Sequence, residues 1–338
     1  MLLDDRALTG FNAPESEVMA VRAEAAGLAG VWATESSTDP FLQSYAMLRA
    51  TESITVGTGI AVAFARNPMS TAYSAWELAG MSGGRFVLGL GTQVRPHIER
   101  RFSMPWPPDP VQRMAEFVDA LEAIWATWRT GKRLDFNGSF YKHDLMTPFF
   151  TPKLHEFAID VYLAGLGERM MHLAGERCAG VILHPLMTVP YLDDVVLPAI
   201  ESGLSAGGRN REHFTVALST FMIVGDSERE LESRREEVRR QIAFYASTPA
   251  YRRVLASIGY EDLQPELRRL SVAGRWGDMA DLVDNELVRH FAVEGTAEEM
   301  PDLCQAKYGT RLDRTSSYFG WSFDDPERLR AVAEGFSQ

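Results

Sequence analysis

Residues 165–169, Gly-Leu-Gly-Glu-Arg, lie between a run typical of a strand, residues 157–164, and a helical run that extends to Cys178. Backbone amides at a helix N-terminus that no side chain obstructs form a natural phosphate site. The first two glycines match a dinucleotide fingerprint, but Met170 stands where its third glycine belongs, so a dinucleotide-binding fold is not indicated. Two interpretations remain for this turn: a phosphate-binding loop or an ordinary tight turn.

A second feature is the lack of side-chain bulk at the ends of two neighbouring strands. Strand interiors prefer bulky residues, so bare strand ends indicate the close approach of another backbone or of a ligand. Either these ends form one wall of a flat pocket, or they fill the tapering interior of a barrel. The small residues are Gly57, Gly59, Ala61 and Ala63 in the first strand and Gly89 and Gly91 in the second.

Both strands belong to one stretch, residues 54–92, that has the form of a βαβ unit. Two short runs of β-branched and apolar residues flank a helical pattern over residues 68–81. Asn67 is the expected N-cap, ahead of a proline at the first helical position, and a pair of glycines at 83–84 marks the end. Such a unit joins two parallel strands by a right-handed crossover.

The alternation of strand and helix patterns extends beyond this unit. Residues 1–8 are a candidate first strand, residues 30–35 a second, and residues 315–319 a candidate last strand. Three strand–helix repeats within the first hundred residues predict a parallel sheet.

Two segments interrupt this alternation. Residues 132–153 are irregular, with several turn signals, and residues 248–290 read as a wholly helical insertion. Long loops inside a compact domain are usually functional. We therefore expect both segments, together with the proline-rich residues 95–110, to line a substrate pocket.

Three motifs identify a family resemblance: Thr58-Gly59-Ile60, Arg66-Asn67-Pro68, and residues 81–91, Met-Ser-Gly-Gly-Arg-Phe-Val-Leu-Gly-Leu-Gly. They resemble the luciferase-like monooxygenase superfamily, and within it the oxidoreductases that depend on the deazaflavin coenzyme F420. The resemblance implies an α/β fold, a single (β/α)8 TIM barrel over residues 1–338 with a helical insertion near the C-terminal part. It also implies that F420, or alternatively FMN, binds at the C-terminal ends of the strands, against a non-prolyl cis peptide bond between Gly59 and Ile60.

The resemblance also assigns residues to the cofactor. The loop after the strand at 157–164 would receive the phosphate through backbone groups, and Arg169 would add charge. Gln93 and Val94 replace the acid found near this point in the sugar-phosphate-oxidising branch, so that substrate is not implied. The assigned residues are Gly59, Ile60, Gly91 and Thr92 at the ring and ribityl chain, and Ala164, Gly165, Leu166, Gly167, Glu168 and Arg169 at the phosphate.

The catalytic assignment falls on Glu35 and Ser36, at the end of the second strand. Relatives often carry an acid followed by histidine there, whereas this chain has serine in place of the histidine. A hydroxyl is a poor proton donor or acceptor at neutral pH. Glu35 would orient the ring or shuttle a proton, or else it is an exposed acid at a strand end. Arg66 matches a family arginine, or else forms a surface salt bridge.

Composition excludes several classes of function. The net charge of −12, from 34 basic and 46 acidic residues, argues against nucleic acid or an anionic membrane as a partner. Two cysteines give no disulfide framework, and no apolar run approaches the length of a membrane span, so we expect a cytoplasmic protein. The seven histidines form no metal motif, and we expect no metal site. His184 ends a strand and faces either the pocket or the core.

These observations lead to three hypotheses about function. The first is hydride transfer between F420 and an unidentified organic substrate. The second is an FMN-dependent monooxygenase on the same barrel, and the third is a catalytically silent barrel that acts as a binding protein. We expect a small-molecule substrate and a homodimer.

Overall fold

The computed structural model describes residues 1–320 and 326–337. Within these residues, eight parallel strands close into a barrel, because β10 pairs with both β9 and β12. The order around the barrel is β1, β2, β3, β5, β8, β9, β10 and β12. The predicted TIM barrel is thus confirmed. The strands are β1 (Leu2–Arg6), β2 (Gly30–Ala33), β3 (Thr55–Thr58), β5 (Phe86–Gly91), β8 (Asp160–Gly165), β9 (Gly180–Leu183), β10 (Thr215–Val224) and β12 (Arg314–Ser317).

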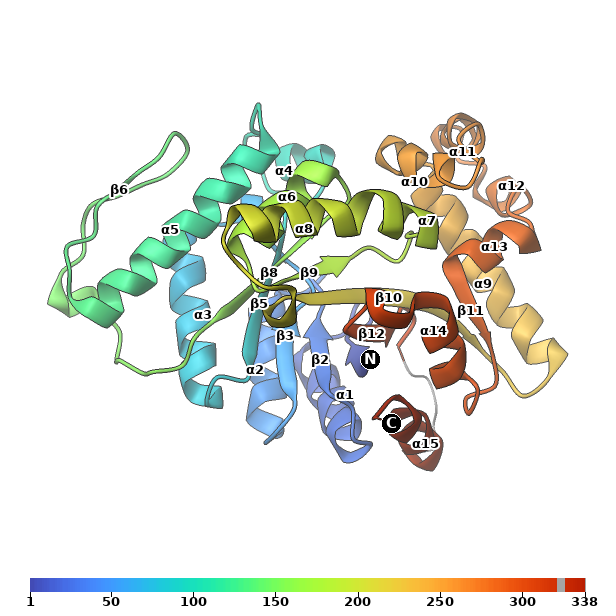
Figure 1. Ribbon diagram of the computed structural model, residues 1–338, viewed down its shortest axis with the longest axis horizontal. Helices are drawn as coiled ribbons and strands as arrows, with labels where there is room; N and C mark the ends of the chain where they lie inside the picture. Colours follow the sequence, from blue (N-terminus) through green and yellow to red (C-terminus); the bar gives the residue numbers. More distant parts are fainter. Residues whose placement is uncertain (321–325, 338) are drawn as a thin grey trace.

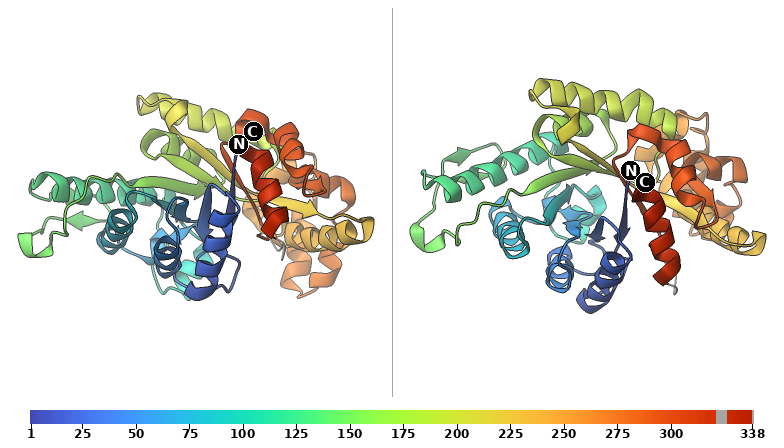
Figure 2. Two further views of the ribbon diagram at one scale, coloured as in Figure 1. Left: turned by 90° about the horizontal axis from the view of Figure 1, so that it is seen from below. Right: turned by 60° about the horizontal axis from the view of Figure 1, so that its bottom comes forward.

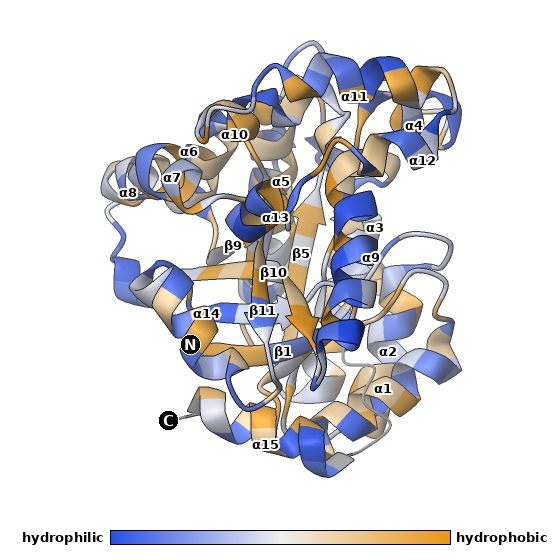
Figure 3. Ribbon diagram, turned by 90° about the vertical axis from the view of Figure 1, so that its right-hand side faces the viewer, coloured by the Kyte–Doolittle hydropathy of each residue, from blue (hydrophilic) through white to orange (hydrophobic). Residues whose placement is uncertain are grey.

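Helices surround the strands (Figure 1). Hydrophilic residues are frequent on the outer faces of these helices (Figure 3), and their buried apolar residues belong to the hydrophobic core. The helices before the insertion are α1 (Ala13–Ala25), α2 (Pro40–Ala50), α3 (Pro68–Ser82), α4 (Arg95–Arg100), α5 (Pro110–Thr130), α6 (Glu168–Arg177), α7 (Val189–Tyr191), α8 (Leu197–Ala206) and α9 (Glu228–Ala246). Those from the insertion onward are α10 (Arg252–Ala256), α11 (Leu263–Val272), α12 (Trp276–Ala280), α13 (Asn285–Phe291), α14 (Met300–Tyr308) and α15 (Pro326–Ser337).

The helix of the central βαβ unit forms as its sequence predicts. The side chain of Asn67 accepts a hydrogen bond from the amide of Ser70, and Pro68 occupies the first helical position. Gly83 ends α3 with φ of 68°, a left-handed conformation that glycine adopts at little cost. α3 therefore begins at the predicted residue and ends at Ser82, one residue later than predicted.

The strand before α3 is interrupted. Gly57 of β3 lies opposite Val87, while Ala61 lies opposite Leu90. The segment that continues β3 therefore contains one more residue than β5 over the same distance. An extra residue of this kind is a bulge, which bends the strand and redirects its backbone. After the bulge the strand resumes as β4 (Ala61–Val62).

The two interrupting segments lie on opposite sides of the barrel (Figure 1). Residues 132–153 contain the hairpin of β6 (Phe136–Asn137) and β7 (Lys142–His143), which projects beyond α5. Residues 248–290 are not wholly helical as predicted, because turns break them into α10, α11, α12 and α13. After them, β11 (Ala292–Gly295) pairs with β10 outside the closed barrel.

The two ends of the described chain lie side by side (Figure 2). β1 pairs with β12 in parallel, and Leu2 lies opposite Arg314. Among residues 1–320 and 326–337, no helix is both long enough and apolar enough to cross a bilayer.

Candidate functional site

A cavity of about 520 Å³ opens at the C-terminal ends of the barrel strands. Ligand sites in TIM barrels occur at this end, and the volume lies in the usual range for a small-molecule site. Residues from seven of the eight barrel strands, or from the positions just after them, reach it. They are Arg6, Gly59, Ile60, Gly91, Ala164, Gly165, Leu166, Ile182, Leu183, His184, Ser219 and Tyr318.

One wall of the cavity carries little side-chain bulk. It is formed by the C-terminal ends of β3, β5 and β8, which are consecutive strands of the barrel. Gly59 and Ile60 stand at the bulge, and the peptide bond between them is cis, as the resemblance implies. Five of the predicted cofactor residues beyond the bulge also line the cavity. They are Gly91, Thr92, Ala164, Gly165 and Leu166.

Both interpretations of the bare strand ends apply, at different positions. A Cβ added to Gly57 would lie 2.4 Å from the ring of Trp32, so this glycine makes room for a side chain that fills the barrel. A Cβ on Gly59 would also meet Trp32, at 3.0 Å. A Cβ on Gly91 would instead lie 2.8 Å from the end of the Ile60 side chain, at the cavity wall. Gly91 is therefore the glycine whose lack of bulk shapes the cavity.

The turn at residues 165–169 brings the N-terminus of α6 to the edge of this wall. Gly167 is the N-cap of α6 and no side chain caps the helix, so its first amides keep their capacity to bind an anion. The backbone oxygen of Leu166 accepts a hydrogen bond of 3.0 Å from the Tyr191 hydroxyl, which holds the turn in place.

A cation that the sequence did not indicate lies beside this turn. A Cβ on Gly167 would be 3.3 Å from Nη1 of Arg253, at the start of the helical insertion. Burial raises the pKa of Tyr191, and the charge of Arg253, together with a hydrogen bond that it donates, opposes this rise. No carboxylate among the described residues lies within ion-pair distance of Arg253. The sequence of α10 gives no sign that this arginine lies beside the turn, because the turn is more than eighty residues away in the chain.

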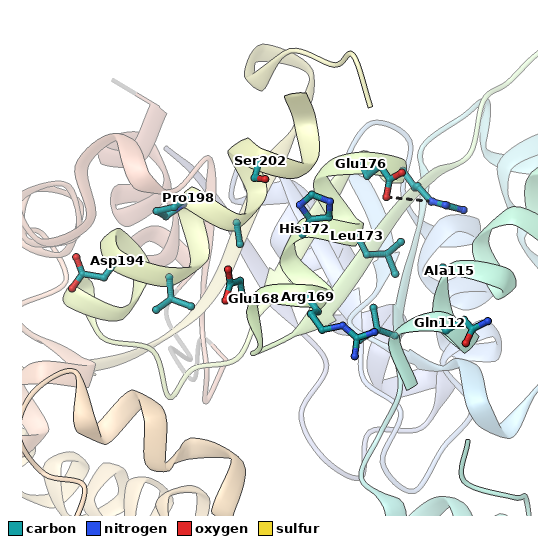
Figure 4. A pocket seen from close by; sticks show the side chains of 14 residues that line it. Gln112, Ala115, Glu168, Arg169, His172, Leu173, Glu176, Asp194, Pro198 and Ser202 are labelled. Atoms are coloured by element: carbon teal, nitrogen blue, oxygen red, sulfur yellow. Dashed lines mark ion pairs between the residues drawn. The ribbon is translucent and has the colours of Figure 1, made fainter. Parts of the chain in front are cut away.

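The side chains of Glu168 and Arg169 point to a different place. They line a second hollow of about 580 Å³ outside the barrel mouth, between α5, α6 and α8 (Figure 4). Arg169 is paired there with Asp109, with a distance of 2.6 Å between Nη2 and Oδ2. The charge predicted for Arg169 at the phosphate is therefore directed elsewhere, and from this turn Gly165 and Leu166 line the main cavity.

Comparison with known proteins agrees with this geometry. The family model described as luciferase-like monooxygenase matches residues 5–314. The chain belongs to this family. It is 44% identical over 301 residues to the uncharacterized protein Rv1360 of Mycobacterium tuberculosis, a match that covers 89% of this chain and 88% of the relative.

Two further relatives of the luciferase-like chain carry names with an activity. A 5,10-methylenetetrahydromethanopterin reductase of Archaeoglobus fulgidus is 26% identical over 289 residues, covering 85% of this chain and 83% of the relative. The structure of the coenzyme F420-dependent tetrahydromethanopterin reductase from Methanopyrus kandleri superposes with a TM-score of 0.79 and 19% identity, covering 99% and 97% of the two chains. The latter likeness concerns the fold.

Glu35 lies beside the bulge of this luciferase-like barrel, but it does not line the cavity. Its Oε2 accepts hydrogen bonds of 2.6 Å from the backbone amide of Val62 and from Nη1 of Arg66. Arg66 also contacts Asp39 at 2.8 Å. The Glu35 side chain is 6% exposed. The geometry thus makes Glu35 and Arg66 a largely buried clamp on the segment after Ile60, while the second pair of Arg66, with Asp39, lies at the surface.

Ser36 follows Glu35 and likewise does not line the cavity. Its hydroxyl is buried, and no hydrogen-bond partner for it exists among the described residues. The catalytic roles predicted for Glu35 and Ser36 stay predictions. Neither residue lines the cavity in this structure.

The wall opposite the glycines is polar and aromatic. Arg6 and Ser219 come from β1 and β10, Tyr318 follows β12, and Tyr245 reaches in from α9. The hydroxyls of Tyr245 and Tyr318 are hydrogen-bonded to each other. Sequence reasoning missed these residues, although the end of the first strand and the end of the last strand are positions that a barrel turns toward its site.

His184 lines the cavity just after β9 and packs between two tyrosines, edge-to-face against Tyr245 and tilted against Tyr251. Its ring centroid lies 4.3 Å from that of Tyr245 and 4.7 Å from that of Tyr251. Nδ1 accepts a hydrogen bond of 3.1 Å from the amide of Leu186, which assigns the proton to Nε2. Burial, together with the charge of Arg6, lowers the pKa of His184 to about 3. The residue is thus a neutral imidazole with one N–H left to donate.

This lowered pKa predicts a pH-dependent stability. An unfolded histidine binds a proton near pH 6.5, whereas His184 in the folded state stays neutral until about 3. The stability is therefore fully present above 6.5 and is lost as the pH falls toward the folded pKa. Between about pH 7 and about pH 5 we expect the wild type to lose about 1–2 kcal/mol more unfolding free energy than His184→Gln. Urea titrations of both proteins at the two pH values measure this, and equal losses would show that the ring is not desolvated.

Only some of the loop segments expected to line the cavity do so. Trp106, from the proline-rich loop, and Thr248, Ala250 and Tyr251, from the start of the helical insertion, line it as expected. Residues 132–153 do not. Their Tyr141 packs edge-on against Phe117 of α5 at 5.6 Å, and the aromatic tip of the segment is exposed. The prediction that this loop lines the pocket is wrong, because Tyr141 docks on the outside of α5 and Phe149 and Phe150 are exposed.

Proposed function

We propose that this protein is an F420-dependent oxidoreductase that transfers a hydride between the deazaflavin and a small organic substrate. One juxtaposition carries the proposal: a side-chain-poor wall lines the cavity as far as Leu166, and the uncapped N-terminus of α6 follows in the chain directly after it. The wall suits a flat ring, and the helix end suits a phosphate tail. The family and its F420-dependent structural relative support the same conclusion.

Bound F420 would supply the redox chemistry, accepting or giving two electrons and one proton as a hydride. The residues of this chain position and enclose the reactants. Gly59, Ile60 and Gly91 support the ring, and the amides beyond Leu166 hold the phosphate. The Nε2–H of His184 donates a hydrogen bond to a substrate oxygen that gains negative charge. Glu35 positions the bulge through Val62.

Arg253 strengthens the phosphate site in this proposal. We expect Arg253→Met to weaken F420 binding by about tenfold, the size of one exposed charge contact. The variant should bind a deazaflavin that lacks the phosphate as the wild type does. Fluorescence titration of both ligands tests this. The exposed Arg169→Met, which removes a pair with Asp109, is the control and should change neither affinity. A loss of affinity for both ligands would place Arg253 at the ring instead.

The cofactor is tested by titrating the purified protein separately with F420 and with FMN and following ligand fluorescence. Tight binding of F420 and weak binding of FMN is the expected result. Tight binding of FMN alone would favour the monooxygenase hypothesis. Binding of neither would favour a silent barrel.

We also propose that the protein is a cytoplasmic homodimer that acts on a small molecule and needs no metal, nucleic acid or membrane. Light scattering on the purified protein tests the dimer. A monomer at all concentrations would contradict it.

A further inference from the structure

Arg6 is a cation held at the bottom of the cavity. It ends β1, lies deep in the molecule, and keeps part of its side chain accessible where it lines the cavity. Nη1 donates to the Ser219 hydroxyl at 3.3 Å and Nη2 to the Thr34 hydroxyl at 3.2 Å. The guanidinium carbon lies 5.1 Å from the centre of the Tyr318 ring. A guanidinium has five N–H donors, and these two long bonds occupy two of them.

No carboxylate of the described chain lies within ion-pair distance of Arg6. Asp5 acts on it only over a longer range. Arg314, on the adjacent strand β12, is by contrast paired with a carboxylate. Its Nε and Nη2 donate to the two carboxylate oxygens of Asp4, at 2.9 and 2.7 Å. A desolvated charge without such a partner is costly. The position of Arg6 therefore favours the binding of an anion that residues 1–320 and 326–337 do not supply.

The order of the strands places Arg6 away from the wall assigned to the cofactor. That wall is built on β3, β5 and β8, and the strands that carry Arg6, Ser219 and Tyr318 are β1, β10 and β12. β2 and β9 separate the two sets on either side, so the sets face each other across the barrel. A ring that rests on the glycine wall leaves Arg6 to whatever lies between the walls.

The remaining groups of this wall define the chemistry of the occupant. One hydroxyl of the Tyr245–Tyr318 pair donates to the other, which leaves one O–H of the pair free to donate beside the guanidinium. Tyr251 and Trp106 add aromatic surface to the cavity lining. A second arginine that lines the cavity, Arg95, is already paired with Glu99 at 2.9 Å. One unpaired cation in a planar fork matches one planar monoanion.

We propose that Arg6, Tyr245 and Tyr318 bind the carboxylate of the substrate, which is a small organic acid with an apolar or aromatic body. The proposal rests on the proposed function in that it names the substrate class of the same cavity. Arg6 acts as a binding and specificity residue, and the carboxylate itself is not altered in the reaction.

Benzoate and its uncharged analogue benzamide are suitable probes. Each is titrated by calorimetry into the protein saturated with F420 and, separately, into the protein alone. We expect benzoate to bind at least about tenfold more tightly than benzamide. Arg6→Met should bind the two probes alike while keeping wild-type affinity for F420. The same change at the paired arginine, Arg95→Met, should keep the preference for benzoate.

Tyr318→Phe provides a second readout if Arg6→Met does not fold. It removes one hydroxyl and keeps the ring, so benzoate should bind several-fold more weakly while benzamide is unaffected. Equal binding of the two probes to the wild type, no binding of either, or a preference that survives Arg6→Met would overturn the proposal. A tenfold loss of F420 affinity in Arg6→Met, with the preference intact, would assign Arg6 to the cofactor. The titrations without F420 separate these results from a failure of the cofactor assignment.

Discussion

Gly91→Leu is expected to weaken F420 binding by about 100-fold, equivalent to about 3 kcal/mol. The added side chain begins 2.8 Å from the end of Ile60 and 3.6 Å from Cβ of Ala164, so it must project along the wall on which the ring would rest. The first obstacle is the end of a flexible side chain, and we therefore expect the barrel to fold. Equilibrium fluorescence titration with F420 measures the loss, and circular dichroism checks the fold.

The matched control for this change is Gly277→Leu in α12. A Cβ at Gly277 meets nothing within 4 Å, and its φ is not left-handed. The control adds the same four carbons on the surface and should leave the affinity unchanged. If Gly91→Leu binds F420 as tightly as the wild type does, the glycine wall does not hold the ring.

Glu35→Ala is expected to lower the free energy of unfolding by about 3 kcal/mol, the cost of breaking a buried ion pair. The substitution removes the carboxylate from both Arg66 and the amide of Val62. Arg66 would keep Asp39, which limits the loss. Urea unfolding followed by circular dichroism measures it.

The comparison for Glu35 is Glu99→Ala, which breaks an exposed pair with Arg95 on α4 and should cost less than about 0.5 kcal/mol. A positioning role predicts that Glu35→Gln also loses stability. Full stability of Glu35→Gln together with lost turnover would instead support the catalytic role that the sequence indicated.

The parallel sheet followed from local patterns, whereas the barrel was an implication of the family resemblance. Asn67, Pro68 and Gly83 define α3 without help from the rest of the chain, and the bare ends of the flanking strands marked one wall of the cavity. These features depend on residues close together in the chain, so one segment of sequence is enough to predict them. The family motifs then indicated the closed topology and the cis bond between Gly59 and Ile60.

The polar and aromatic wall opposite the glycines could not be predicted in this way. Arg6, Ser219 and Tyr318 come from three strands that closure of the barrel brings together, and Tyr245 comes from a helix outside it. The clamp between Glu35 and Arg66 joins residues about thirty positions apart, and the strand-end pattern did not reveal which acid meets which base. Long-range pairs of this kind depend on the tertiary structure, whereas caps and bulges depend mainly on neighbours in sequence.

The division of the cavity into a cofactor wall and a substrate wall is tested most directly by a crystal structure of the protein with F420. We predict that the ring lies against Gly59, Ile60 and Gly91, with the phosphate at the amides that begin α6 and beside Arg253. Arg6 should remain free to meet a second ligand. A ring stacked on Tyr318 with its carbonyls on Arg6, or a phosphate bound away from Gly167, would contradict this account.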